Sequence, residues 1–356
     1  MKIGILNSGG DCPGLNAVIH GVVGAASKLG WEVIGFRDGY EGLLGDGDYF
    51  PLTLASTNGI VKLGGTILGT TNKGHFAAKV GAGDVMEVPQ EIITSAKATF
   101  ERLGLGGLII VGGDGSLTTA MQLYKEGWPV VGVPKTIDND LQATATTFGF
   151  HSAVASVVDA LDRLHTTGTA HKRVMVLEAM GRQAGWIALY GGLGGDADAI
   201  LLPEIPYDMA KVAAVINQRV ADGKQGLLVV VAEGAKPKGG TQVKLERKGS
   251  EDRLGGIGER VAAEIEQLTG RETRTCVLGH LQRGGSPTAL DRILGTRFGV
   301  MAVHLIRDRQ FGRMVSYQSY QVGSVPIEHA VNRLHLVDPQ SEIVAAARSV
   351  GICFGD

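Results

Sequence analysis

The sequence predicts an α/β protein whose mainly parallel sheets are covered by helices on both faces. Short runs of apolar residues, such as 108–111 and 129–133, lack the polar alternation of a half-exposed strand, as expected for strands buried on both faces. These runs alternate along the chain with longer segments of helical periodicity. A chain of 356 residues is too long for one small core, so we expect two lobes of ordinary domain size.

In the first half of the chain, each apolar run is followed by a turn rich in small residues and then by a segment with helical spacing. Residues 41–100 are less regular before their final helix, and the glycine-rich segment 64–70 within them could wrap a ligand. We expect strands at 3–6, 31–36, 108–111 and 129–133, and helices at 15–29, at 91–103 and directly after 112–116.

The second half repeats the same rhythm. Residues 236–252 mix charges with Pro and Gly, which predicts a solvated loop or a β-excursion without a chemical role. The helix at 258–268 has an ordinary amphipathic pattern, typical of core packing. We expect strands at 173–178, 199–202, 226–232 and 273–278, and helices at 150–164, 183–193, 208–221, 258–268 and 290–306.

Composition excludes several classes of function. A net charge of -2 argues against nucleic acid or an anionic membrane surface as the main partner. We expect neither a secretory leader nor a membrane span, because no basic-then-apolar start and no apolar run of 18 residues is found. The three cysteines have no metal-ligand spacing, which fits a cytoplasmic location. The 54 glycines indicate many tight turns and close backbone approaches to ligand.

The segment 134–140, Pro-Lys-Thr-Ile-Asp-Asn-Asp, follows the apolar run at 129–133, so we expect it at the carboxyl end of a buried strand. Ligands of open parallel sheets bind beyond such ends. Asp138 and Asp140 could face one small volume, where one takes a proton from an attacking hydroxyl and the other holds Mg²⁺. The alternative is a turn rich in Asp and Asn that caps the next element.

Two glycine-rich segments, 8–14 and 112–116, each connect a predicted strand to a predicted helix. In such a turn the backbone N–H groups can approach a phosphate, and the helix dipole favours negative charge there. The first segment is neither a Walker loop nor a G-x-G-x-x-G fingerprint. Asp114 in the second could bind Mg²⁺. The alternatives are a tight structural turn and a capped helix start.

Charged side chains gather at the predicted strand ends. Carboxylates beside glycine turns suit a nucleotide bound with Mg²⁺, whereas arginines suit an anionic second substrate because guanidinium groups bind phosphate bidentately. For any single arginine the alternative is a surface ion pair. These residues are Asp114, Asp138, Asp140, Arg173, Arg182, Glu233, Arg274, His280 and Arg283.

Together these motifs resemble those of the 6-phosphofructokinase family. The matching segments occur in family order and at family-like spacing, from the start of the chain to about residue 300: they are 9–11, 112–116, 134–140, 180–182 and 279–287. The resemblance implies two Rossmann-like three-layer lobes with the active site in the cleft between them. It also implies transfer of the γ-phosphoryl group of ATP to the 1-hydroxyl of fructose 6-phosphate.

The resemblance further implies a division of the chain and an assembly. Residues 1–149 with about 282–332 would form the phosphoryl-donor lobe, and 150–281 with about 333–356 the sugar-phosphate lobe. Family members are usually homotetramers built from dimers, so we expect a homotetramer, with a dimer as the alternative.

Site residues carry over by position. Asp138 would be the general base, Thr136 would contact the transferring group, and Asp114 and Asp140 would hold Mg²⁺. Arg182 would join the catalytic residues. The donor positions are Gly10, Tyr40, Asn72, Lys73, Gly115, Ser116 and Lys135. The sugar-phosphate positions are Thr136, Asp138, Met180, Gly181, Arg182, Glu233, His280 and Arg283, with Arg173 and Arg274 reaching the 6-phosphate from a neighbouring subunit.

The chain departs from the family pattern at the phosphoryl donor. Lys135 is typical of pyrophosphate-dependent relatives, whereas Gly115 is typical of ATP enzymes. We expect ATP, because a carboxylate at position 115 would repel the nucleotide α-phosphate, whereas Lys135 can fold aside. Pyrophosphate is the alternative donor. The family's arginine that bridges both substrates aligns with Asn72, and the adjacent cation Lys73 could substitute as a point charge.

A further departure concerns regulation. Of the basic residues at the allosteric site of bacterial ATP enzymes only Lys224 is retained, so we expect regulation by ADP or phosphoenolpyruvate to be absent or altered. The other positions hold His20, Gly24, His165 and Asp222. A non-catalytic regulatory paralogue is the competing interpretation; intact Asp138, Asp114 and Thr136 argue against it.

Overall fold

The computed structural model describes residues 1–76, 87–245 and 253–356. The chain forms two compact units. The first unit comprises 1–137, 141–152 and 283–334, and the second comprises 138–140, 153–282 and 335–356. The chain therefore passes between the two units several times, and two of these passages lie within the segment 137–141.

The first unit is built on a sheet in the order β14-β13-β5-β4-β1-β2-β3, with β6 paired to β5. Neighbouring strands in the stretch from β13 to β2 run parallel, while β3 and β14 run antiparallel at the two edges. The strands are β1 (Lys2–Asn7), β2 (Glu32–Phe36), β3 (Tyr49–Leu52), β4 (Leu105–Gly112), β5 (Val130–Thr136), β6 (Phe148–Gly149), β13 (Arg313–Gln318) and β14 (Gln321–Pro326).

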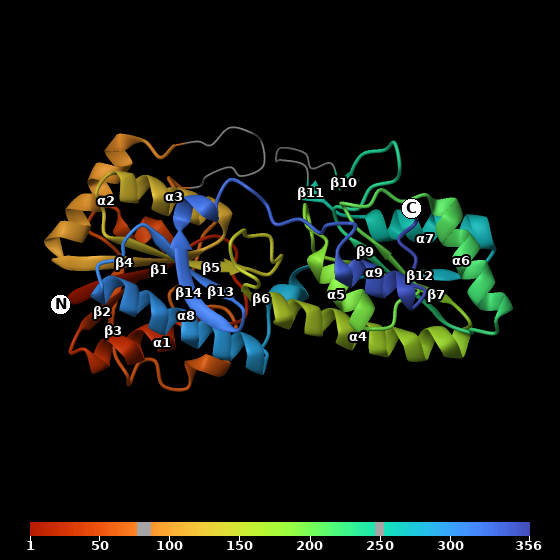
Figure 1. Ribbon diagram of the computed structural model, residues 1–356, viewed down its shortest axis with the longest axis horizontal. Coiled ribbons are helices and arrows are strands. Elements are labelled where there is room, and N and C mark those ends of the chain that lie inside the picture. Colours follow the sequence, from red (N-terminus) through yellow and green to blue (C-terminus); the bar gives the residue numbers. More distant parts are fainter. Residues whose placement is uncertain (77–86, 246–252) are drawn as a thin grey trace. The chain divides into compact units, whose positions relative to one another are not determined.

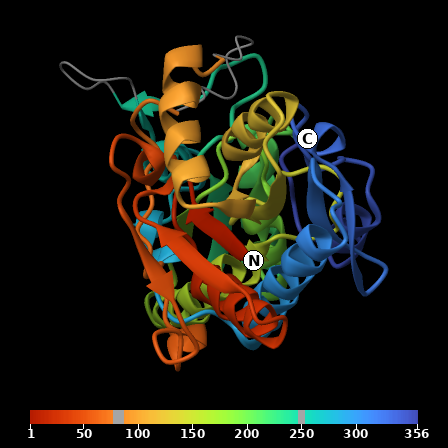
Figure 2. The same cartoon turned by 90° about the vertical axis from the view of Figure 1, so that its left-hand side faces the viewer.

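Helices cover both faces of this sheet, with α1 and α8 on one face and α2 and α3 on the other (Figures 1 and 2). Helices α1 and α8 lie close together, since a Cβ on Gly299 would come within 2.3 Å of the Val18 carbonyl oxygen. The helices are α1 (Leu15–Lys28), α2 (Gln90–Arg102), α3 (Asp114–Lys125) and α8 (Ala289–Arg307), with short 3₁₀ turns at Gly39–Leu43, Ile60–Lys62 and Ile327–His329.

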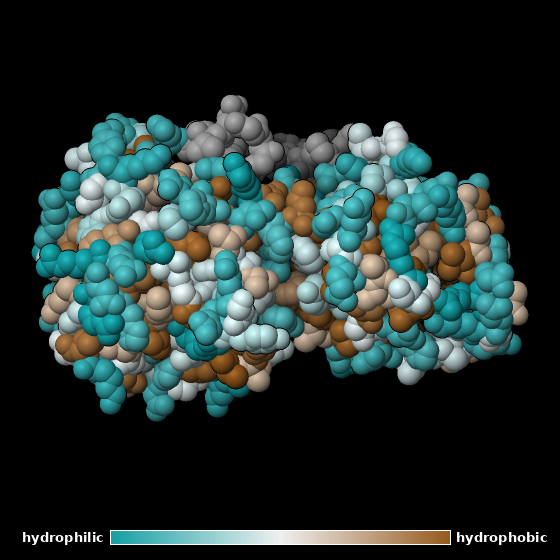
Figure 3. Space-filling view, in the orientation of Figure 1, coloured by the Kyte–Doolittle hydropathy of each residue, from teal (hydrophilic) through white to brown (hydrophobic). Residues whose placement is uncertain are grey.

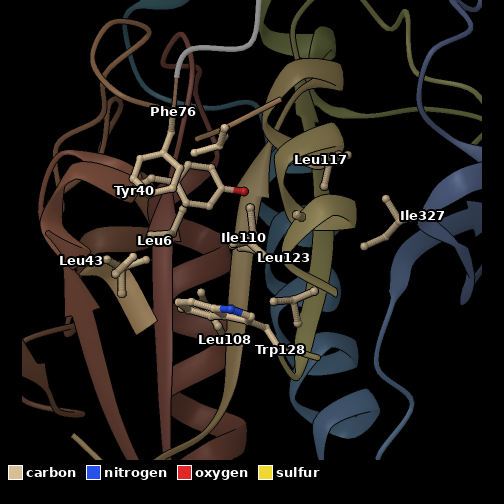
Figure 4. Packing of buried hydrophobic residues seen from close by; sticks show 14 of the residues in the cluster. Leu6, Tyr40, Leu43, Phe76, Leu108, Ile110, Leu117, Leu123, Trp128 and Ile327 are labelled. Atoms are coloured by element: carbon tan, nitrogen blue, oxygen red, sulfur yellow. The ribbon is translucent and has the colours of Figure 1, made fainter. Parts of the chain in front are cut away.

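The core on the α2 and α3 face joins strands, helices and the 3₁₀ turn after β2 (Figure 4). Tyr40 stacks on Phe76 with ring centroids 5.0 Å apart, and Phe100 packs against Trp128 at the same distance. These aromatic rings fix the turn that carries Tyr40 against the sheet. Burial of such rings supplies much of the driving force for folding.

The second unit contains a parallel sheet in the order β12-β7-β9-β8. Helices α4 and α5 pack together on one face, and α6 and α7 contribute to the core of the other. The strands are β7 (Val174–Ala179), β8 (Ala199–Leu201), β9 (Leu227–Ala232) and β12 (Thr273–Val277), with a short hairpin of β10 (Lys244–Leu245) and β11 (Arg253–Leu254). The helices are α4 (Phe150–His171), which begins in the first unit, α5 (Trp186–Gly194), α6 (Met209–Ala221), α7 (Ile257–Thr269) and α9 (Glu342–Ser349), with a 3₁₀ turn at Gly279–Arg283.

The fold class expected from the sequence is confirmed as a mixed α/β architecture with mainly parallel sheets. The expectation that the strand after residue 129 ends at 133 is wrong: β5 continues through Lys135 and Thr136, because β6 pairs with these two residues. Strands β3, β13 and β14 and helix α9 were not expected. Part of the β-excursion predicted at 236–252 and part of the irregular stretch 41–100 lie outside the described residues.

Hydrophilic side chains cover much of the face of each unit seen in Figure 3, with hydrophobic side chains scattered between them. Among the described residues, none of the helices is both long enough and apolar enough to cross a membrane.

Candidate active site

The strand order of the first unit creates a point where consecutive connections leave in opposite directions. The chain runs from β1 through α1 to β2 on one side, and from β4 through α3 to β5 on the other. Strands β1 and β4 are parallel neighbours, so their carboxyl ends adjoin. Open α/β sheets bind ligands in the crevice at such a switch point. The two glycine-rich turns, 8–14 and 112–116, follow these two strands.

Two cationic side chains lie against the first glycine turn. The Lys135 ammonium donates to the Gly10 carbonyl oxygen, and Arg283 Nη1 donates to the Asp11 carbonyl oxygen at 3.1 Å. A Cβ on Gly10 would stand 2.8 Å from Arg283 Nη1, so a side chain there would displace the guanidinium group from this position. Lys135 and Arg283 make the turn a favourable place for an anion.

The second glycine turn is fastened to the first. Ser116 Oγ donates to Ser8 Oγ at 2.9 Å, and the Tyr40 hydroxyl donates to the Ser116 carbonyl oxygen at 2.7 Å. Burial raises the pKa of Tyr40 well above its usual value, so the phenol remains a neutral donor. Gly112 lets Ser116 approach, since a Cβ there would lie 2.3 Å from the Ser116 Cβ.

The loop that carries Asn72 and Lys73 is held at both ends. The Gly9 N–H donates to the Thr71 carbonyl oxygen at 2.9 Å, so the loop starts against the first glycine turn. At its other end the His75 N–H donates to Glu41 Oε1 at 2.7 Å. Asn72 and Lys73 themselves are exposed. The structure thus brings this loop beside the donor positions of the first unit.

The carboxylates expected to hold Mg²⁺ belong to different units. Asp114 begins α3, and its Oδ1 accepts from the Asn332 N–H at 2.9 Å; Asp140 lies in the second unit. Among the described residues there is no group of three or more His, Cys, Asp or Glu side chains that could hold a metal ion. Mg²⁺ is commonly held by one or two carboxylates plus substrate phosphates. Asp114 and Asp140 are carboxylates of the kind that bind an ion arriving with a phosphorylated ligand.

The segment 134–140 crosses between the units after Ile137. On the first-unit side β6 pairs with Lys135 and Thr136, and Thr147 Oγ1 donates to the Thr136 carbonyl oxygen at 2.7 Å. On the second-unit side Asn139 adopts a left-handed conformation with φ of 52°. Thr136, expected to contact the transferring group, and Asp138, expected to be the general base, thus belong to different units.

In the second unit, the carboxyl ends of the parallel strands carry Met180 after β7, Glu233 after β9 and His280 after β12. The Glu233 N–H donates to the Ala179 carbonyl oxygen at 2.9 Å, and the Gly234 N–H to the Gly181 carbonyl oxygen at 3.1 Å. Buried Gln282 accepts from the Met180 N–H at 3.3 Å. The structure therefore brings together, at the carboxyl ends of the parallel strands, Met180, Gly181, Arg182, Glu233 and the 279–282 turn.

Arg173 and Arg274 lie at the opposite ends of the strands in this sheet. Arg173 precedes β7 and Arg274 is the second residue of β12, so both occupy amino ends of strands. Both pair with Glu272, with Arg173 Nε 2.8 Å from a carboxylate oxygen, and this pairing lowers the pKa of Glu272. Because β7 and β12 are parallel, both arginines lie at the opposite end of these strands from Met180 and His280 of the same chain.

Buried polar groups near the first glycine turn are structural. Burial raises the pKa of Cys12 to about 12, so this thiol stays protonated and unreactive. Buried Asp291 accepts from the Ser152 N–H at 2.7 Å and from Ser152 Oγ at 2.6 Å. Burial lowers the pKa of neighbouring His151, against the opposing effect of Asp291.

Several residues that fix the site were not expected from the sequence. Apart from Gln282, which lies within the segment 279–287, they lie outside the glycine and charged motifs. They act by holding backbone carbonyls or amides, which leaves no local pattern. They are Glu41, Thr147, Trp186, Gln282, Asp291 and His335.

Comparison with known proteins gives consistent matches. The family model described as phosphofructokinase matches residues 2–306. An ATP-dependent 6-phosphofructokinase of Chloroflexus aggregans is 51% identical over 355 residues, covering 100% of this chain and 98% of that protein. A pyrophosphate–fructose 6-phosphate 1-phosphotransferase of Streptomyces coelicolor is 46% identical over 361 residues and covers 100% of both chains. The structure of Pichia pastoris phosphofructokinase in the T-state superposes with a TM-score of 0.81 at 29% identity, over 98% of this chain and 36% of that longer chain.

Proposed function

The chain belongs to the phosphofructokinase family, and we propose that it transfers the γ-phosphoryl group of ATP to the 1-hydroxyl of fructose 6-phosphate. The observation that carries this proposal is the pair of glycine turns at the switch point of the first unit, flanked by Lys135 and Arg283. Backbone N–H groups and nearby cations are what a polyphosphate requires.

We assign Asp138 as the general base that takes the proton from the 1-hydroxyl, because a positioned carboxylate is needed to activate an alcohol. Thr136 would contact the transferring group, and Arg182 would stabilise its charge. Asp114 and Asp140 would hold Mg²⁺, which neutralises charge on the phosphates during transfer. The first glycine turn, Tyr40 and Ser116 would orient the donor.

The sugar phosphate would bind at the carboxyl ends of the parallel strands in the second unit. The backbone contacts between the β7 and β9 ends support this assignment, because they hold the loop 180–182 beside Glu233. His280 follows the carboxyl end of β12. Arg283 belongs to the first unit and would meet the sugar phosphate as the family resemblance implies.

The donor assignment rests on Lys135 and Gly115. Lys135 is 4% exposed and donates to the Gly10 carbonyl oxygen, which supports the idea that its side chain folds against the turn and leaves space for a nucleotide. Relatives of similar identity are named for ATP and for pyrophosphate, so pyrophosphate is the second candidate. We also propose a cytoplasmic homotetramer, as is usual for the family.

The test is a coupled assay of fructose 1,6-bisphosphate formation with each donor at matched Mg²⁺. Turnover with ATP and little with pyrophosphate supports the proposal. Strong turnover with pyrophosphate and none with ATP would show that pyrophosphate, and not ATP, is the donor. A protein that binds fructose 6-phosphate but turns over neither donor would be a regulatory paralogue.

A further inference from the structure

The backbone of the turn 138–140 is hydrogen-bonded to His335, which lies almost 200 residues later in the sequence. The His335 N–H donates to the Asp140 carbonyl oxygen at 2.8 Å, and His335 Nδ1 lies 3.1 Å from the Asn139 carbonyl oxygen. A carbonyl oxygen only accepts, so Nδ1 carries the proton in this contact. Two consecutive carbonyls of the turn are therefore held by one residue, and all three residues belong to the second unit.

His335 is in turn held by Trp186. The two rings stack with centroids 4.7 Å apart and planes inclined by 24°, and Trp186 Nε1 donates to the His335 carbonyl oxygen at 2.7 Å. Trp186 is 8% exposed and begins α5, four residues after Arg182. The stack thus joins the turn 138–140 to the helix that follows the sugar-phosphate loop.

Neighbouring backbone contacts fix the same pair. Glu204 accepts from the Gly185 N–H at 2.9 Å and from the Val337 N–H at 2.9 Å, so one carboxylate holds the residue before Trp186 and the residue two after His335. Burial raises the pKa of Glu204. His335 therefore sits on a scaffold anchored on both sides, as a group must be if it is to orient another.

We propose that His335 is a positioning residue for the reaction, and that with Trp186 it sets the orientation of the Asp138 and Asp140 carboxylates through the backbone of their turn. The proposal rests on the proposed function, which assigns the base to Asp138 and a metal contact to Asp140. Asn139 is left-handed with φ of 52°, a conformation that costs free energy unless its surroundings hold it. The hydrogen bonds from His335 supply that restraint.

The first experiment compares His335→Ala with His335→Asn, because the asparagine amide can donate from nearly the position of Nδ1. We expect His335→Ala to lower kcat by about 10- to 100-fold, the effect of a misplacement of about 1 Å, with KM for fructose 6-phosphate changed less than about threefold. His335→Asn should recover most of the loss. His329→Ala, an exposed histidine of the neighbouring 3₁₀ turn, is the matched control and should leave kcat unchanged.

Two outcomes would overturn the proposal. One is a folded His335→Ala protein with wild-type kcat. The other is a His335→Asn protein as impaired as His335→Ala, which would show that ring packing alone matters. If His335→Ala does not fold, the comparison moves to Trp186→Phe, which keeps a smaller aromatic ring and removes the donor to the His335 carbonyl. Trp31→Phe, at a half-buried tryptophan of the first unit, is its control.

Hydrogen exchange separates this proposal from the proposed function. The His335 amide donates to Asp140, so peptides covering residue 335 should exchange faster in Trp186→Phe than in wild type or Trp31→Phe. Unchanged exchange would mean that Trp186 does not hold His335. This measurement requires no turnover. A wild type that turns over neither donor would overturn the proposed function and leave the contact between His335 and the turn to be decided by exchange.

Discussion

At the residue scale, Lys135 and Gly115 bear on the choice of donor in opposite ways. The ammonium of Lys135 donates to the Gly10 carbonyl oxygen, so it balances the partial negative charge of that oxygen and lies close against the backbone. Gly115 is the second residue of α3, in the turn fastened to Ser8 through Ser116. Gly115 therefore lies in the turn where the donor phosphates are proposed to bind.

We predict that Gly115→Asp lowers turnover with ATP by at least about 100-fold, because a fixed negative charge would face the nucleotide phosphates. Turnover with pyrophosphate should fall less or rise. The measurement is kcat/KM for each donor. Gly115→Asn, which adds the same volume without the charge, separates sterics from repulsion. Equal loss with both donors in Gly115→Asp would contradict this assignment.

The base and metal roles can be told apart by a second pair of variants. Asp138→Asn should lower kcat by about 10²- to 10⁴-fold, the usual contribution of a general base. Asp140→Asn should instead raise the Mg²⁺ concentration needed for half-maximal rate, because a ligand is weakened while the base remains. Initial rates over a Mg²⁺ titration report both effects. A Mg²⁺ requirement shifted only by Asp138→Asn would exchange the two assignments.

At the element scale, one buried carboxylate serves the start of two helices. Asp291 lies in the first turn of α8, and its Oδ2 accepts from the Ser152 N–H in the first turn of α4. Negative charge is favourable at a helix N-terminus, and here two N-termini share it. Helix α4 begins in the first unit and continues into the second, so this contact anchors an element common to both.

We predict that Asp291→Ala lowers the free energy of unfolding by about 1–3 kcal/mol, because the buried Ser152 amide and hydroxyl lose this acceptor. Asp291→Asn keeps an acceptor oxygen and should cost less. Denaturant unfolding at neutral pH gives both values. Equal stability of wild type and Asp291→Ala would refute the role assigned to this carboxylate.

Lys224, the basic residue that the family resemblance places at the effector site, has a structural partner. Its Nζ lies 2.8 Å from Asp198 Oδ1, and the Asp198 side chain is 1% exposed and also accepts from the Leu228 N–H at 2.9 Å. Breaking a buried ion pair by removing one member leaves a buried charge, which is costly. Arg219 lies 3.6 Å from the same oxygen and would compensate in part.

We therefore predict that Lys224→Met lowers the melting temperature and leaves the response to phosphoenolpyruvate and ADP as weak as in wild type. Thermal unfolding and rate titrations with each effector test the two parts. Lys172→Met, an exposed lysine of the second unit, is a control for loss of charge alone. Strong inhibition of wild type by phosphoenolpyruvate that Lys224→Met abolishes would contradict this interpretation.

At the scale of the whole molecule, the amino and carboxyl ends of the strands in the second-unit sheet carry different arginines. Arg173 and Met180 flank the six residues of β7, so they are seven residues apart and lie about 23 Å apart along the strand at ~3.3 Å per residue. One side chain cannot span that distance. The geometry supports the proposal that Arg173 and Arg274 complete the site of a neighbouring subunit.

Subunit mixing tests this proposal. Asp138→Asn and Arg274→Ala should each be inactive alone, yet hybrids of the two should regain activity, because one site in each mixed pair combines an intact Asp138 with an intact Arg274. The assay follows turnover after co-refolding, with mixtures of wild type and Asp138→Asn for calibration. Hybrids that stay inactive, or a monomeric wild type by light scattering, would contradict it.

The sequence predicted the buried parallel strands and the helices between them because their signal is local. A strand covered on both faces needs an unbroken apolar run, as in β4 and β9. The edge strands β3 and β14 and the adjoining strand β13 were not predicted, since their mixed composition is also that of a loop. The two-residue strand β6 is defined only by its pairing with β5, which no local pattern encodes.

By itself, the sequence determined the fold class, the family and the candidate chemistry, because glycine turns and carboxylates act through residue types at fixed short spacings. The tertiary structure alone decided how these groups are held. It placed Lys135 and Arg283 against one glycine turn and divided the segment 134–140 between two units. It showed that Arg173 and Arg274 lie at the amino ends of their strands, away from Met180 and His280. It also brought His335 to the turn of Asp138 across almost 200 residues. Such contacts depend on pairing and packing between distant segments, which a single sequence does not record.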